Sequence, residues 1–256
     1  MLSWLPVLLL ALAAGTIGGL VGFGSSIMLT PALVRLVGPT EAVPIMAIAG
    51  LMANLSRVAV WWRVVDWRVV GAFSVTSLPM AALGAGTLVA IDANDIQLVL
   101  GLFFLAMIPI RRWLLAAGLR VGLAGMALVG AGVGFLSGLV TAVGPINTPF
   151  FLAYGLAKGA YISTEAMASA LMGLVKSGVF RGLGALPMET FLSGLLVGGA
   201  ITVGSWLSKR LMMKIEAHRF QLLMDGLLAV AAAVMIGGVI GDTWPTFWPA
   251  MAVLLR

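Results

Sequence analysis

The sequence predicts an all-α integral membrane protein that forms one polytopic domain, residues 1–256. Of its 256 residues, 61% are hydrophobic and only 9% are charged, whereas soluble domains are about 45–50% apolar and about 25% charged. The mean hydropathy is +1.13. The chain has room for roughly eight to ten membrane-crossing segments of about 20 residues each. No long polar stretch remains from which a separate soluble domain could be built.

The sequence also predicts an internal duplication. GTIGGLV, which starts at Gly15, matches GFLSGLV, which starts at Gly134. Three more matches follow in the same order: Thr-Pro at 30 and 148, Thr-Glu-Ala at 40 and 164, and IDANDIQLVLG at 91 with IEAHRFQLLMDG at 215. The separations range only from 118 (148 − 30) to 124 (164 − 40). We therefore predict two homologous halves, residues 1–115 and 119–241.

Each half contains five apolar segments, and the second segment of each set is short. In the first half they are 2–21, 25–37, 41–62, 69–90 and 96–110, and in the second 121–140, 145–157, 163–182, 190–207 and 219–240. A thirteen-residue helix such as 25–37 reaches only about 20 Å, against a hydrocarbon core of about 30 Å. Each half is therefore expected to comprise a broken, re-entrant helical hairpin plus three transmembrane helices. Residues 242–256 are rich in Trp and are expected to form an interfacial tail.

If the chain turns back at each glycine-rich break, the two halves have inverted topology. With the amino terminus outside, ten basic residues then fall on one side: Arg63, Arg68, Arg111, Arg112, Arg120, Lys158, Lys209, Arg210, Lys214 and Arg219. The other side receives Glu41, Asp92, Asp95, Glu189 and Asp242. This distribution agrees with the positive-inside rule. The alternative is a plain eight-helix protein without re-entrant arms.

The composition also bounds the function. The chain has no cysteine and one histidine, so thiolate metal sites and cysteine catalysis are excluded, and a membrane-embedded enzyme is poorly supported. No Gly-rich phosphate-binding loop occurs, so ATP coupling is not expected. No cofactor is expected. The formal charge of +6 is explained by cytoplasmic loops, and no nucleic-acid partner is expected.

The two breaks are the best candidates for a binding site. A glycine and proline interruption at matching places in two inverted halves marks the site of many transporters, because free backbone amides and positive helix ends favour an anion. The candidate residues are Gly24, Ser25 and Ser26 in the first break, and Gly144, Pro145, Asn147 and Thr148 in the second. Thr30 and Thr148 are expected to be N-caps, each followed by proline at the first helical position. Other glycines of the motifs, such as Gly15, Gly132, Gly134 and Gly138, are expected to permit close helix packing.

Basic residues inside the segments favour an anionic ligand. Lys176 and its neighbour Ser177 lie deep in the segment 163–182, where an unpaired lysine costs at least about 2.5 kcal/mol. Lys176 is expected either to bind substrate or to pair with Asp225. Asn54 and Arg57 share one helix face, and Arg181 is a further candidate. For Arg57 and Arg181 the alternative is that the side chain extends to a membrane edge.

Glu41 and Glu165 each follow a threonine at the expected start of a long helix. We expect both to cap the helix and to complement its dipole, and we expect neither to transfer protons.

The paired motifs GTIGGLVGFGSSIMLTPAL and GFLSGLVTAVGPINTPFFL resemble those of the sulfite exporter TauE/SafE family, and the likeness covers residues 8–240, including the R-x-x-D-W turn from Arg63 to Trp67. The resemblance implies a bacterial inner-membrane carrier of sulfite, sulfonates or related sulfur-containing anions. Ser25 and Ser26 stand where the family often has glycine, as do Thr141 and Val143 in the second copy.

The sequence therefore predicts a secondary transporter that moves a small anion, sulfite or an organosulfonate, by alternating access at a site between the repeats. A channel-like anion pathway through the same residues is the alternative. The lipid bilayer is the expected surrounding, and a homo-oligomer is compatible with the sequence.

Overall fold

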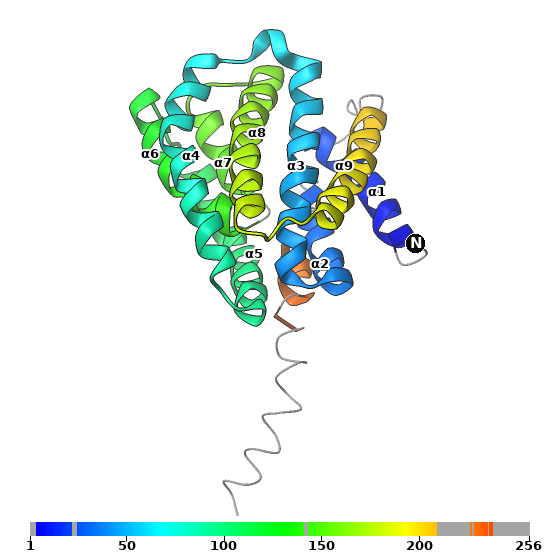
Figure 1. Ribbon diagram of the computed structural model, residues 1–256. Coiled ribbons are helices and arrows are strands. Elements are labelled where there is room, and N and C mark those ends of the chain that lie inside the picture. The colour runs from blue at the N-terminus through cyan, green and yellow to red at the C-terminus, as the bar shows by residue number, and fades with distance from the viewer. Residues whose placement is uncertain are drawn as a thin grey trace, which may run out of the picture.

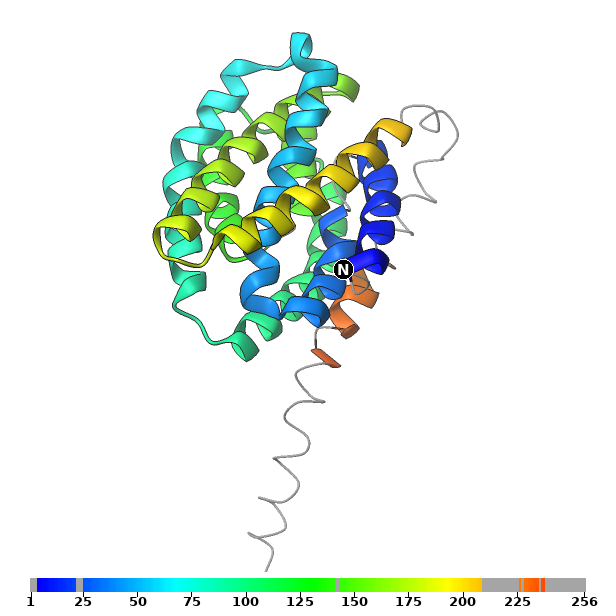
Figure 2. The same cartoon turned by 45° about the vertical axis from the view of Figure 1, so that its right-hand side comes forward.

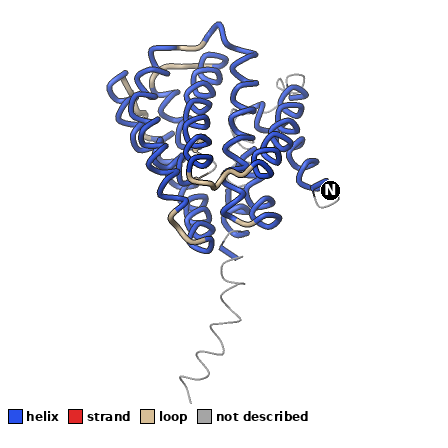
Figure 3. The backbone as a smooth tube through the Cα atoms, viewed as in Figure 1, coloured by secondary structure: helices blue, strands red, loops and turns tan. Residues whose placement is uncertain are grey.

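A computed structural model describes residues 4–21, 25–140, 143–208, 226, 228–234 and 236–237. Within these residues the chain is helical and contains no strand (Figure 3). The helices are α1 (Leu5–Val21), α2 (Ser25–Val37), α3 (Pro39–Trp61), the short 3₁₀ helix η2 (Trp62–Val64), α4 (Trp67–Val89), α5 (Ala93–Ala116), α6 (Leu123–Leu139), α7 (Gly144–Ala153), α8 (Lys158–Gly182) and α9 (Met188–Ser208). Residues 228–234 are also helical.

The predicted segments and the observed helices correspond one to one from residue 5 to residue 208. The largest shift at the start of a helix is at α8, which begins at Lys158 and not near residue 163. Gly155 adopts φ 106°, a left-handed conformation that favours glycine, so the chain turns there and α8 starts soon after. The expected tail 242–256 lies outside the described residues.

Among the residues that the structure describes, four helical stretches are long and apolar enough to cross a membrane: Pro39–Val64, Trp67–Val89, Ala93–Leu114 and Met188–Trp206. The helices next to the two breaks are shorter. α2 has 13 residues and α7 has 10, which correspond to about 20 Å and about 15 Å. Neither length spans a hydrocarbon core of about 30 Å, as expected for the arms of a broken hairpin.

Helices α3 and α8 lie at the centre of the molecule, with α4 and α6 on one side and α1 and α9 on the other (Figures 1 and 2). α4 packs against α6, and α1 packs against α9. α3 and α8 run antiparallel, because the ring of Trp61 near the end of α3 lies against Gly159 at the start of α8, and Leu51 lies against Gly173. The centre of the bundle is therefore a contact between two oppositely directed helices.

Glycines bring the outer helices together. A β-carbon added at Gly15 of α1 would meet the carbonyl oxygen of Ile201 in α9, and one added at Gly134 of α6 would meet the backbone of Ser77 in α4. Gly138 meets the α4 backbone in the same way. The expectation of close packing is confirmed at these three positions. It is wrong for Gly132, where an added β-carbon has no neighbour within 4 Å.

Basic residues predominate in the turns at one end of the bundle and acidic residues in the turns at the other, although Asp66 lies at the basic end and Arg35 and Arg181 lie at the acidic end. The amide of Asp66 donates to Thr164 Oγ1 at 2.9 Å, and the amide of Val121 donates to the Ala153 carbonyl at 3.2 Å. These contacts gather the turns that carry Arg63, Arg68 and Arg120 at one end. At the other end a small apolar cavity is lined by Thr40, Leu88, Ile91, Ile96, Phe180 and Ala185. The turns around that cavity carry Glu41, Asp92, Asp95 and Glu189.

Candidate functional site

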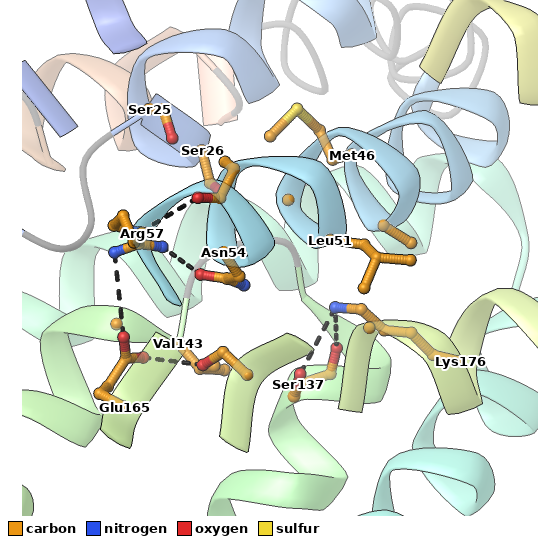
Figure 4. Close-up of a pocket in the computed structure, with 16 residues that line it drawn as sticks. Ser25, Ser26, Met46, Leu51, Asn54, Arg57, Ser137, Val143, Glu165 and Lys176 are labelled. Carbon is orange, nitrogen blue, oxygen red and sulfur yellow. Dashed lines mark hydrogen bonds and ion pairs between the residues drawn. The ribbon is translucent and has the colours of Figure 1, made fainter. Parts of the chain in front are cut away.

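Both helix breaks open onto one cavity between α3 and α8 (Figure 4). Its volume is about 70 Å³, enough for several water molecules or one small oxyanion. Ser25 and Ser26 at the start of α2 line it, together with Val143 and Gly144 at the start of α7. The other lining residues come from α3, α8 and the end of α6: Met46, Ala47, Gly50, Leu51, Ala53, Asn54, Arg57, Ser137, Glu165, Ser169, Gly173 and Lys176.

The short helices begin earlier than the proline positions predict. Thr30 and Thr148 are not N-caps, because Pro31 and Pro149 lie inside α2 and α7. Instead each threonine hydroxyl donates one turn back, Thr30 to the Ser26 carbonyl at 2.6 Å and Thr148 to the Gly144 carbonyl at 2.8 Å. The start signal of α7 is Pro145, which stands in the first turn, where its missing amide leaves no hydrogen bond unmade. The amino-terminal ends of both helices therefore lie at the cavity wall, where their positive ends favour an anion.

Arg57 is half-buried at one end of the cavity, with its side chain 14% exposed. Its Nη2 donates to Asn54 Oδ1, and its Nε donates to the Ala53 carbonyl at 3.4 Å. Its Nη1 lies 3.9 Å from Glu165 Oε2 and makes no hydrogen bond within the described residues. Two of the guanidinium nitrogens are thus held by α3, and the third faces α8.

Glu165 is a wall residue of the cavity, and the expectation that it caps a helix is wrong. Because α8 begins at Lys158, Glu165 lies in the second helical turn, with its side chain only 4% exposed. Its Oε1 accepts hydrogen bonds from Asn147 Nδ2 at 3.2 Å and from Ser169 Oγ at 2.7 Å. Sequence reasoning missed it because Thr-Glu imitates a helix start; a carboxylate within an apolar segment was the available signal. Glu41, by contrast, does lie in the first turn of α3.

Lys176 lies on the opposite side of the cavity from Arg57 and is 8% exposed (Figure 4). Its Nζ donates to the Ser137 carbonyl at 3.0 Å and approaches Ser137 Oγ at 3.4 Å. Ser137 lies in the last turn of α6, so the lysine ties α8 to the end of the helix that precedes the second break. The alternative partner Asp225 lies outside the described residues.

The remaining predicted residues differ in their relation to the cavity. Asn147 is fully buried and reaches the cavity through Glu165. Thr148 Oγ1 is 2.7 Å from the hydroxyl of Tyr161, and Ser177 Oγ donates to the Gly173 carbonyl at 2.7 Å.

Arg181 lies in the last turn of α8, where its Nη1 donates to the Leu186 carbonyl at 2.9 Å. Pro145 is buried in the first turn of α7, and Gly24 lies outside the described residues.

Ten of the lining residues form five pairs whose members are 119 positions apart. That separation is the one between the two glycine motifs (134 − 15). The pairs are Ser25 with Gly144, Met46 with Glu165, Gly50 with Ser169, Asn54 with Gly173, and Arg57 with Lys176. The two cations of the wall, Arg57 and Lys176, are therefore one such pair, on two antiparallel helices.

The site carries a net positive charge. The charged lining residues are Arg57, Lys176 and Glu165, which sum to +1 when all are ionised. Two helix amino termini add partial positive charge. No group of three or more metal-ligating side chains occurs within the described residues. The charges of this wall favour a small anion over a cation, and a cationic cavity inside a bundle of apolar helices is typical of a membrane transporter.

The chain belongs to the sulfite exporter TauE/SafE family, which matches residues 7–235. Members of this family are transporters, not enzymes, and the chain is therefore a multi-pass membrane transporter. No curated protein and no solved structure matches the chain.

Proposed function

We propose that the protein is a secondary transporter that carries a small sulfur oxyanion, sulfite or a short organosulfonate, through the cavity between α3 and α8. The observation that carries this proposal is the meeting of both helix breaks and both buried cations at one cavity. The family supplies the class of anion. Ser25 and Ser26 donate to the anion, the positive ends of α2 and α7 attract it, and Arg57 and Lys176 balance its charge.

The two halves are inverted repeats in this proposal. Equivalent helices α3 and α8 are antiparallel, as inversion requires. The packing of α1 against α9 corresponds to the packing of α6 against α4, with the roles of the halves exchanged. The pairs of lining residues 119 positions apart also support a two-fold relation through the cavity.

The end of the bundle with Arg63, Arg68 and Arg120 faces the cytoplasm of a bacterial inner membrane in this proposal, and the amino terminus lies outside. The support is the separation of basic and acidic turns, which agrees with the positive-inside rule. Arg57 and Glu165 then lie in the cytoplasmic half of the cavity and Lys176 in the outer half.

Alternating access follows from the same symmetry. Because each half contributes one short arm and one central helix, exchanging the conformations of the two halves would open the cavity first to one side and then to the other. The cavity volume of about 70 Å³ favours an oxyanion of the size of sulfite over a long organosulfonate.

A flux assay in liposomes tests the proposal. Purified protein should move sulfite or methanesulfonate faster than protein-free vesicles, with saturation, and should show counterflow of labelled substrate. Flux that saturates without counterflow would contradict the carrier and favour a pore. No movement of either anion would overturn the proposed function.

A further inference from the structure

One carboxylate oxygen of Glu165 is held by two hydrogen bonds, and the other has no hydrogen-bond partner within the described residues. Oε1 accepts hydrogen bonds from Asn147 of α7 and Ser169 of α8. Oε2 is buried, makes no hydrogen bond within the described residues and faces Arg57 Nη1 at 3.9 Å. This distance is longer than a hydrogen bond. The side chain is therefore oriented through one oxygen, while the other presents its negative charge to the cation of the cavity.

Arg57 has one guanidinium nitrogen, Nη1, without a hydrogen-bond partner within the described residues. Nη2 and Nε are engaged with Asn54 and Ala53 of its own helix. An anion that binds at Nη1 meets the nitrogen that faces Glu165 Oε2 at 3.9 Å, so a second negative charge would lie next to the carboxylate.

The two ends of the cavity differ in this respect. Met46 lies 119 positions before Glu165, and Arg57 lies 119 positions before Lys176. The carboxylate of Glu165 lies beside only one of the two cations, Arg57. The lining charges sum to +1 with Glu165 ionised and to +2 with Glu165 protonated.

Few other titratable groups face Glu165 from the elements packed around it. α3 contributes Arg57, and α8 itself contributes Tyr161 one turn before Glu165 and Lys176 farther along. Asp66, the residue before α4, is also near, because its amide donates to Thr164 Oγ1 at 2.9 Å. α6 and α7 contain no titratable side chain, and the single basic residue of α4, Arg68, lies at its exposed start.

We propose that Glu165 is a proton-binding site and that the protein carries a proton together with its anion. In the empty cavity the ionised carboxylate faces Arg57. When the anion reaches Nη1, Glu165 Oε2 takes up one proton from cavity water, and the anion and the proton cross in the same direction. Release of the anion on the far side lets the proton leave, and the pair with Arg57 forms again. This inference rests on the proposed function.

Simultaneous measurement of anion and proton movement tests the inference. Liposomes that contain the full-length protein and a lumenal pH indicator are given an inward gradient of methanesulfonate, with the membrane potential clamped. Methanesulfonate is chosen because it stays ionised near neutral pH and brings no proton of its own. The wild-type protein should acidify the lumen as the anion enters, by about one proton per anion. Glu165→Gln should lower the number of protons that enter per anion toward zero, whatever its effect on the rate of anion entry. Glu189→Gln, which changes an exposed carboxylate on α9, should give the wild-type number of protons per anion.

The outcomes separate the two proposals. Wild-type anion uptake without acidification would overturn proton coupling and leave anion transport intact, as would acidification that persists in Glu165→Gln. If the protein moves sulfite but not methanesulfonate, the number of protons that enter per sulfite is measured for the wild type and for Glu165→Gln. Equal numbers overturn the inference. No anion movement in the wild type overturns the proposed function and the coupling with it.

Discussion

Arg57 and Lys176 face one cavity from two antiparallel helices, and they lie 119 positions apart in the sequence. Arg57 is the eighteenth residue after the start of α3, and Lys176 is the eighteenth after the start of α8. Each therefore lies about 27 Å along its helix. Because the helices run in opposite directions, the two cations lie toward opposite ends of the cavity.

Lys176→Ala should weaken anion binding much more than removal of an exposed basic residue. A buried hydrogen bond from a charged group contributes about 1.5–3 kcal/mol, which corresponds to about a 10- to 100-fold rise in the apparent Kd. Arg120→Ala, in the exposed turn between α5 and α6, is the matched control and should change binding less than about twofold. The apparent Kd from the concentration dependence of flux reports both values, and equal effects would remove Lys176 from the site.

Removal of one member of the Arg57–Glu165 pair should destabilise the protein more than replacement of both members by apolar residues. Glu165→Ala leaves a buried guanidinium opposite an apolar group, and loss of one partner of a buried ion pair costs about 3–5 kcal/mol. The double variant Arg57→Met/Glu165→Met removes both charges and should recover most of that loss, because an apolar pair of similar volume needs no desolvation of ions. Thermal unfolding in detergent measures the two effects. A double variant no more stable than Glu165→Ala would contradict the coupling of these residues.

Gly134→Ala should destabilise the bundle, whereas Gly132→Ala should not. A β-carbon at Gly134 meets the α4 backbone at Ser77, which cannot rotate away, and one at Gly132 meets no atom within 4 Å. Overpacking of this kind costs about 1–3 kcal/mol, while alanine at an open helical position is favourable. The comparison of melting temperatures tests the difference between two sites on one helix, and equal melting temperatures would argue against tight contact between α6 and α4.

Single cysteines should report the orientation without background, because the chain has no cysteine. Asp92→Cys at the acidic end should react with a membrane-impermeant maleimide in intact cells. Arg120→Cys at the basic end should react only after the membrane is permeabilised. The reverse pattern would place the amino terminus inside, and labelling of both from outside would contradict the opposed ends.

The helix breaks and the buried cations could be predicted from the sequence because their signals are local. Glycine and proline within an apolar run mark a break, and a lysine deep in such a run needs a polar partner. The position of Glu165 depends on the start of α8, which is set by the turn at Gly155. The contact of Lys176 with Ser137 joins residues 39 positions apart, and the hydrogen bond from Asn147 to Glu165 joins α7 to α8. Such contacts arise only when the helices pack together.

Location of a bound anion is the most direct test of the account. Crystals of the full chain grown with selenite would reveal the anion through the anomalous scattering of selenium. The account predicts a peak in the cavity between α3 and α8, with anion oxygens about 3 Å from Arg57 or Lys176 and from amides at the start of α2 or α7. A peak only at the arginines of the exposed turns, with the cavity free of selenium, would contradict it.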